Sequence, residues 1–356
     1  MSDEIITVSI DDGHFNNKGQ IIGKDGHIIS YLSPSYVMNG SNSSFGVMGN
    51  EDTSEFTTLD AQGNTKTFTT FERVRYGEEE NMVETQSHEY LHSEANRVMV
   101  HSMLHKMGLA GKKVALITTS PIRRYFKANG EVDQQYVDKR NANLMQPVYP
   151  ALEGVEPVEV VSVVQIPEAY AAFLSLLFDY RVNSGKGQLK IQQDYKSVDI
   201  LLLDFGGQTL DAGVISNAQP MKADCITAEG VGMLAVNELV YDELKTYRRK
   251  IDRREIMDII ETGKFRTSRH TDNVIDVSET VGKSIRKVYE NGLHNIKSKI
   301  PFGDFDMILG AGGALKNPTV ARTISGLIPE IKLIDEPMYA NANGGLKYLI
   351  KMMSSK

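Results

Sequence analysis

Two segments almost 200 residues apart share one pattern, and this repeat constrains the fold more than any other feature of the chain. Ile10-Asp11-Asp12-Gly13 and Leu203-Asp204-Phe205-Gly206 each end an apolar, strand-like run and place a Gly two residues after an Asp. Polar residues and a second strand-like run follow in both cases, which predicts a β-hairpin. A separation of this length does not fit a solenoid repeat. The repeat therefore predicts two similar α/β domains that face each other across a cleft.

Such a pair of hairpins is suited to phosphate binding. Glycine lets backbone N–H groups come close to phosphate oxygens, and a tight hairpin directs several of them at one anion. Asp11 and Asp204 can hold Mg²⁺ through water, since this ion keeps much of its hydration shell. Either hairpin alone would be explained as a simple turn, whereas two matched copies favour a nucleotide. The expected phosphate contacts come from Gly13, His14, Phe15, Asn16 and Lys18 in the first hairpin, and from Gly206, Gly207, Gln208 and Thr209 in the second.

A third glycine cluster follows the apolar strand predicted over 305–309. Gly310, Gly312, Gly313 and Ala314 could approach an adenosine or its α-phosphate through bare backbone. As a motif this cluster is weak, because turns from strand to helix use glycine for other reasons. The sequence contains neither a Rossmann glycine spacing nor a Gly-Lys-Ser/Thr phosphate loop.

The bulk composition excludes several classes of protein. The 356 residues, 41% hydrophobic and 24% charged, describe a globular chain long enough for two domains. A net charge of −7 without a basic face argues against direct nucleic-acid binding. The single cysteine, Cys225, excludes an internal disulfide and fits a reducing cytoplasm, and the histidines form no metal-ligand pattern. We find no signal peptide and no apolar run of about 20 residues, so we expect a cytoplasmic protein without membrane contact.

Alternating strands and helices predict an α/β architecture. The first domain is expected at 1–180 plus 340–356, with a loop-rich insertion at about 33–90. The second is expected at 181–339, with a mostly helical insertion at about 235–295. Other expected elements are a helix over 93–107, a helix over 168–180 with Pro167 in its first turn, an exposed loop over 183–193, and a C-terminal helix packed on the first domain.

Five further segments matter together with the hairpins because of the order in which they occur along the chain. They are His101–Leu109, Thr119–Phe126, Lys139–Asn143, Pro167–Ala172 and Asn343–Tyr348. Together with the two hairpins and Leu309–Ala314, they resemble the bacterial actin-like plasmid-segregation proteins of the ParM (StbA) family. The likeness covers most of the chain. It implies an actin-like fold, with two duplicated α/β domains around a nucleotide cleft and a smaller inserted subdomain in each.

The resemblance also implies a function, namely an ATPase that uses ATP (or GTP) and Mg²⁺. It implies that copies of the chain assemble into a filament, and that hydrolysis of the nucleotide within the filament controls disassembly. It also implies a DNA-binding adaptor that links the filament to a plasmid. By the same resemblance Glu168 orients the attacking water, Asp204 holds water and Mg²⁺, and Glu229 and Gly232 lie near ribose and base. These roles fit γ-phosphate hydrolysis, which depends on positioning and charge neutralisation.

The residues themselves leave some alternatives open. His14-Phe15 stands where the family places small or hydroxyl residues, so His14 either donates to phosphate or points away and leaves the contact to backbone amides. Glu168 and Glu229 could instead be helix-start residues. The basic run Arg248–Arg254 is better explained as a solvated face than as a filament contact. The rival functions are an actin-like cytoskeletal protein without a plasmid role and a small-molecule kinase on the same fold.

Overall fold

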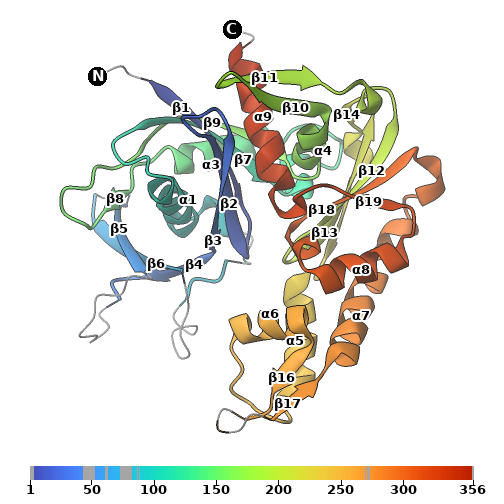
Figure 1. Cartoon of the computed structure of the whole chain (residues 1–356). Coiled ribbons are helices and arrows are strands. Elements are labelled where there is room, and N and C mark those ends of the chain that lie inside the picture. The colour runs from blue at the N-terminus through green and yellow to red at the C-terminus, as the bar shows by residue number, and fades with distance from the viewer. Residues whose placement is uncertain are drawn as a thin grey trace. The chain divides into compact units, whose positions relative to one another are not determined.

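The computed structural model describes residues 4–42, 53–60, 63–72, 82–85, 87, 89–268, 270 and 273–354 (Figure 1). The chain divides into two compact units. The first consists of Met1–Lys127, Glu131–Gln192 and Asn341–Lys356, and the second of Ala128–Gly130 and Gln193–Ala340. The first unit thus runs to Gln192, beyond the residue 180 expected from the sequence.

A mixed five-stranded sheet forms the centre of the first unit. Its strand order is β3-β2-β1-β7-β9, with the hairpin β1–β2 antiparallel and with β7 and β9 parallel to β1. The strands are β1 (Ile5–Asp12), β2 (Asn16–Ile22), β3 (Ile28–Pro34), β7 (Lys113–Ser120) and β9 (Glu159–Pro167). The helices α2 (Ile122–Tyr125) and α3 (Gln134–Leu144) lie between β7 and β9 in the chain.

The sheet of the second unit repeats this plan. Its order is β14-β13-β12-β18-β19, the hairpin β12–β13 is antiparallel, and β18 and β19 are parallel to β12. The strands are β12 (Asp199–Phe205), β13 (Thr209–Ser216), β14 (Gln219–Pro220), β18 (Met307–Ala311) and β19 (Ile331–Leu333), with β15 (Ile226–Glu229) also paired to β13. The predicted duplication is therefore confirmed at the level of sheet topology.

An additional sheet enlarges the first unit around the helix α1 (Glu94–Lys106). It has the order β4-β6-β5-β8 and consists of β4 (Tyr36–Asn39), β5 (Thr53–Leu59), β6 (Thr65–Phe71) and β8 (Tyr149–Pro150). The α1 helix packs against β4, β5 and β6 on one side and against β1 to β3 on the other (Figure 1). Its start agrees with the sequence prediction, because the Ser93 side chain accepts a hydrogen bond from the Asn96 amide. Parts of the predicted insertion lie outside the described residues.

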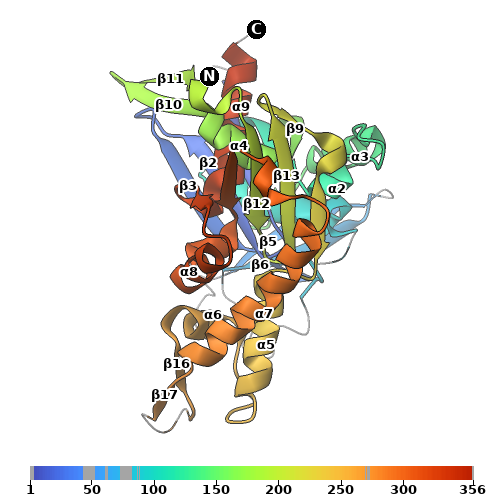
Figure 2. The same cartoon turned by 90° about the vertical axis from the view of Figure 1, so that its right-hand side faces the viewer.

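The second unit also carries an additional part, which projects from one end of its sheet in both views (Figures 1 and 2). It contains α5 (Met233–Leu244), α6 (Arg253–Thr262), the hairpin of β16 (Lys264–Arg266) and β17 (Val274–Asp276), and α7 (Ser278–Lys297). Its basic run is not a uniformly solvated face. The Arg248 side chain, only 12% exposed, pairs with Glu255 and lies over the ring of Phe265 at 5.3 Å.

Two sequence predictions were wrong, the helix over 168–180 with Pro167 in its first turn and the exposed loop over 183–193. Pro167 ends β9 instead of starting a helix, and α4 covers only Tyr170–Leu177. The parallel pairing with β7 continues through Pro167, and Ala169 then takes a positive φ of 60°. The segment 183–193 is no exposed loop, because β10 (Phe178–Asn183) pairs with β11 (Lys186–Ile191). This hairpin belongs to the first unit, where the Tyr180 hydroxyl donates a hydrogen bond to the Gly26 carbonyl at 2.9 Å.

The C-terminal helix α9 (Ala340–Ser354) returns to the first unit, as the sequence predicts. The Asn343 side chain donates to Gln20 at 3.0 Å, and the Lys347 ammonium donates to the Ser175 carbonyl at 2.7 Å, near the end of α4. No helix within the described ranges has the length and apolar character needed to span a bilayer.

Replacement of Gly344 by Ala is expected to disrupt the packing of α9 on α4. A Cβ at Gly344 would lie 1.6 Å from the Ala171 carbonyl oxygen, so the helices must separate. We expect a loss of about 1–3 kcal/mol or more in unfolding free energy, measured by chemical denaturation. Gly282→Ala is the matched control, since a Cβ there meets no atom within 4 Å; it should be neutral or stabilise α7 by about 0.5–1 kcal/mol. Equal effects of the two substitutions would contradict the prediction.

Candidate nucleotide-binding site

The two hairpins that carry the repeat have matching geometry. Each turn has three residues between its strands. In the antiparallel ladder of the first hairpin Asp11 lies opposite Lys18, and in that of the second Asp204 lies opposite Asp211. A Cβ on Gly13 would lie 3.0 Å from a backbone carbonyl oxygen three residues later, and a Cβ on Gly206 would do the same at the same distance. In each repeat a side chain at this position would make a tight contact with the backbone, which glycine avoids.

The three carbonyl groups of the first loop each accept a hydrogen bond from a residue further along the chain. The Ser35 hydroxyl donates to the Gly13 carbonyl at 2.7 Å, the Thr85 hydroxyl donates to the His14 carbonyl at 2.7 Å, and the Ser35 amide donates to the Phe15 carbonyl at 3.0 Å. In a trans peptide the N–H that follows a carbonyl points the opposite way. Three consecutive amides, the last that of Asn16, are thereby directed away from these partners, as a backbone anion site requires.

The second loop is held in a comparable way by the start of α5. The amides of Met233 and Leu234 donate to the carbonyls of Gly206 and Gly207 at 3.3 and 2.9 Å. The N–H groups of Gly207 and Gln208 therefore point away from α5. This contact also explains Gly232, because a Cβ there would lie 2.4 Å from the Gly207 carbonyl oxygen.

The glycine cluster after β18 meets the second hairpin. Gly312 has a φ of 106°, and a Cβ on it would lie 2.4 Å from the Asp204 carboxylate. Gly313 and Ala314 begin the short 3₁₀ helix η6 (Gly313–Lys316). Gly310 lies in a different environment, because a Cβ there would meet the side chains of Ile331 and Leu333. The close packing of β19 therefore explains the glycine at this position.

Glu229 is also brought to the second loop. It ends β15 and lies opposite Thr209 in the antiparallel ladder, with an exposed side chain. The helix-capping alternative for Glu229 was wrong, since the N-cap of α5 is Gly232 and no side chain caps it. The Thr209 hydroxyl donates to Asp211 at 2.7 Å.

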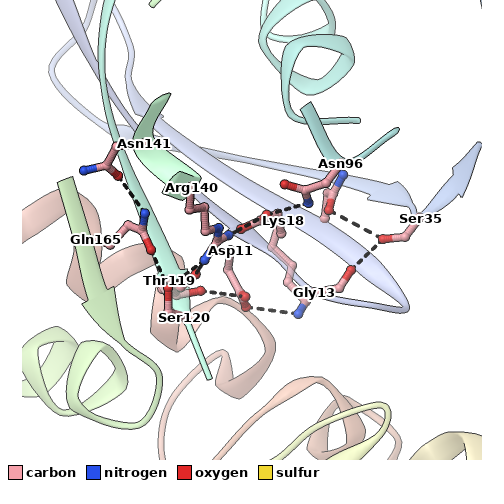
Figure 3. A network of polar contacts seen from close by, with 12 residues as sticks. Asp11, Gly13, Lys18, Ser35, Asn96, Thr119, Ser120, Arg140, Asn141 and Gln165 are labelled. Carbon is pink, nitrogen blue, oxygen red and sulfur yellow. Dashed lines mark hydrogen bonds and ion pairs between the residues drawn. The ribbon is translucent and has the colours of Figure 1, made fainter. Parts of the chain in front are cut away.

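Asp11 is fixed from two sides in the first unit (Figure 3). The Lys18 ammonium and the Thr119 hydroxyl each donate to one of its oxygens at 3.0 Å. A carboxylate accepts about four hydrogen bonds, so these two leave capacity for water around a metal ion. Within the described part of the chain no three His, Cys, Asp or Glu side chains form a metal-binding group. The remaining acceptor capacity of Asp11 fits an ion held through water, as Mg²⁺ is commonly held.

Asp12 belongs to a buried polar network that the sequence did not reveal. Its carboxylate accepts from the Arg140 guanidinium at 2.5 and 2.6 Å and from the side-chain amide of Asn96 at 2.7 Å. A carboxylate at the end of a buried strand requires such a partner, and this requirement was the available signal. Ser35 and Thr85, which hold the first loop, were missed as well, because their contacts depend on chain folding.

Glu168 follows β9 directly and is half-buried. Its amide donates to the Ser120 carbonyl at 2.8 Å, which places it beside the end of β7. The next residue, Ala169, is fully buried with φ 60° and ψ −50°. Backbone strain of this kind costs about 1–3 kcal/mol and is found mostly at functional sites. Because α4 begins only at Tyr170, Glu168 is not a first-turn residue of that helix.

The His14 side chain turns toward the protein. Its Nδ1 is bonded to the Thr85 carbonyl, and its ring lies 6.0 Å from the ring of Tyr90. A carbonyl only accepts, so Nδ1 carries the proton. Burial lowers the pKa of His14, and the bond to Thr85 offsets only part of this effect. Neutral His14 then has an accepting Nε2, so the geometry favours a phosphate contact through backbone amides.

We expect His14 to be neutral and Nδ1-protonated at pH 7. Because its folded-state pKa is lowered, folding stability linked to His14 falls as the pH drops below 6.5. Nitrogen-15 NMR of the histidine rings gives both the tautomer and the titration midpoint, with His14→Gln used to assign the signals. A midpoint above 6.5, or a proton on Nε2 in the neutral form, would contradict this assignment.

Comparisons with known proteins place this geometry in a family. Residues 6–178 match the family model of the N-terminal part of the plasmid segregation protein ParM. The chain is similar over 98% of its length to a 15-stranded ParM filament from Clostridium botulinum (20% identity, TM-score 0.70, 99% of that chain). It is similar over the same share to ParM of Bacillus thuringiensis with ATP (15%, 0.67, 99%) and to an archaeal actin homolog in complex with ADP (15%, 0.71, 100%).

Comparison with curated protein sequences finds no match. The identities to the solved structures are low, so these structures establish the fold. They confirm the actin-like α/β fold expected from the sequence, with a mixed sheet in each unit. The chain has the actin-like fold, and its residues 6–178 match the N-terminal family model of the ParM (StbA) plasmid segregation proteins.

Proposed function

We propose that the chain is a nucleotide-dependent, filament-forming protein that separates plasmid DNA through a DNA-bound adaptor. ATP (or GTP) with Mg²⁺ is the nucleotide, and its hydrolysis in the filament controls disassembly. The observation that carries this proposal is the pair of matched loops whose carbonyls accept hydrogen bonds from their own unit, so that the amides that follow point away from these donors. The family match over residues 6–178 and the titles of the similar structures, a ParM filament and a ParM with ATP, support it.

The proposed site assigns separate tasks to the two loops. The amides of His14 to Asn16 and those of Gly207 and Gln208 bind phosphate oxygens, with Lys18 adding positive charge. The Gly206 amide itself donates to the Thr209 carbonyl within the hairpin. The backbone at Gly312, Gly313 and Ala314 contacts the adenosine, and Glu229 and Gly232 contact the ribose and base. When bound, Mg²⁺ supplies charge neutralisation to the phosphates, and Asp11 and Asp204 hold it through water. Glu168 orients the water that attacks the γ-phosphate.

Polymer formation is expected to depend on a nucleoside triphosphate. In light scattering and sedimentation, ATP and a non-hydrolysable analogue should both produce sedimentable polymer, and only the ATP polymer should disassemble with time. ADP alone should give none, and GTP in place of ATP tests the nucleotide preference. Absence of polymer with every nucleotide, over a range of salt and protein concentration, would exclude the filament.

The variant Glu168→Ala is expected to separate hydrolysis from binding. Loss of a group that positions and polarises the attacking water should lower phosphate release by about 100-fold or more. Nucleotide affinity should stay within about threefold, because the phosphate contacts come from other residues, and the ATP polymer should persist. Glu159→Ala, an exposed Glu at the start of the same strand, is the matched control. Hydrolysis at the wild-type rate would remove Glu168 from this role.

A further inference from the structure

The two units use different residues at one equivalent position. Asp12 and Phe205 each follow the repeated Asp and precede the repeated Gly, and both are buried. Phe205 packs in an apolar core against Tyr289, with ring centroids 5.5 Å apart. Asp12 instead pairs with Arg140, whose side chain has no exposed surface. The hairpin fold therefore does not require a charge at this position.

A buried ion pair is a poor means of stabilisation. Removing two charges from water costs several kcal/mol for each ion, and replacement of such pairs by apolar residues is often neutral or stabilising. Burial lowers the pKa of Arg140, but the attraction of Asp12 and its hydrogen bonds, together with Tyr136 and Glu168 nearby, outweigh this and raise the pKa, so the guanidinium keeps its charge. The first unit thus retains a costly ion pair where the second has an aromatic side chain. This contrast indicates a role other than stability.

The contacts of Arg140 show what the ion pair connects (Figure 3). One guanidinium nitrogen, Nη2, donates to both oxygens of Asp12, at the base of the first loop. The other, Nη1, donates to the Thr119 carbonyl at 2.5 Å and to the Ser120 hydroxyl at 2.6 Å, at the end of β7. The planar fork therefore fixes the distance between the two strand ends.

The end of β7 in turn holds two proposed site residues. The Thr119 hydroxyl donates to Asp11, and the Ser120 carbonyl accepts from the Glu168 amide. The Ser120 hydroxyl also donates to Gln165 on β9, at 2.7 Å. A single guanidinium thus lies behind both the loop that presents amides to phosphate and the segment that carries Glu168.

We propose that Arg140 is a positioning residue that sets the first phosphate loop and Glu168 in register with each other. Its side chain has no exposed surface, so it acts through Asp12, Thr119 and Ser120. This inference rests on the proposed function for its effect on hydrolysis. Its structural part, a shared support for two segments far apart in sequence, is tested separately.

The variant Arg140→Lys is the decisive test. A lysine keeps the charge that Asp12 needs, but its single nitrogen cannot hold Asp12 and the end of β7 at the two places that the fork reaches. The protein should stay folded, with kcat for phosphate release lowered about 10- to 100-fold, as expected for a small misplacement of reacting groups. KM should stay within about threefold, since the amides still bind phosphate. A wild-type kcat in folded Arg140→Lys would overturn the proposal.

Two further variants cover other outcomes. Arg97→Lys is the matched control, because Arg97 is also a buried arginine of the first unit but pairs with Glu94 on its own helix; kcat and KM should stay within about twofold. If Arg140→Lys fails to fold, the double variant Asp12→Asn/Arg140→Met removes both charges and leaves no unpaired buried ion. It should show the same loss of kcat, and wild-type kcat in this variant would overturn the proposal.

Amide hydrogen exchange without nucleotide separates this inference from the proposed function. In Arg140→Lys, peptides that cover 12–16 and 167–170 should both exchange faster, whereas Arg97→Lys should leave both unchanged. If the wild-type protein hydrolyses no nucleotide, the proposed function fails and the exchange data still decide the role of Arg140. Unchanged exchange in either peptide would overturn the shared support.

Discussion

Both hairpin loops depend on one constraint, namely that their carbonyl groups are bound by donors of their own unit. Ser35 and Thr85 bind the carbonyls of the first loop, and the first amides of α5 bind those of the second. Because a trans peptide directs its N–H opposite to its C=O, these contacts decide where the amides point. Glycine at Gly13 and Gly206 avoids the tight contact that a Cβ would make with the carbonyl oxygen three residues later.

The two units hold their loops with different kinds of side chain. In the second unit the loop follows the buried Phe205, which is part of an apolar core, and its carbonyls accept hydrogen bonds from the start of α5. The first unit anchors its loop on a polar network around Asp12 and Arg140 that also reaches the end of β7. Apolar packing tolerates small displacements, whereas charge-assisted hydrogen bonds fix both distance and direction. The polar anchor lies in the unit that also carries Glu168.

The parts of the fold that were predictable are those with a local pattern. The apolar strands before Asp11 and Asp204, the α1 helix and the returning C-terminal helix each follow from the periodicity of their own residues. Pro167 and the segment 183–193 were assigned wrongly because pairing partners decided them. Pro167 continues β9 alongside β7, and the Gly- and Lys-rich segment becomes a strand because it pairs with β10. Such pairing is not visible in a single segment.

By itself, the sequence determined the duplication, the two Asp-Gly hairpins and the α/β class, because these depend on spacings of a few residues. Only the tertiary structure decided what each polar residue does. Asp11 and Asp12 are adjacent and chemically the same, yet the pleat directs their side chains to opposite faces of the strand. Asp11 meets Lys18 and Thr119, and Asp12 meets Arg140 from 128 residues away along the chain. No local pattern contains such a contact, since the free energy of a buried charge depends on which partner the fold brings to it.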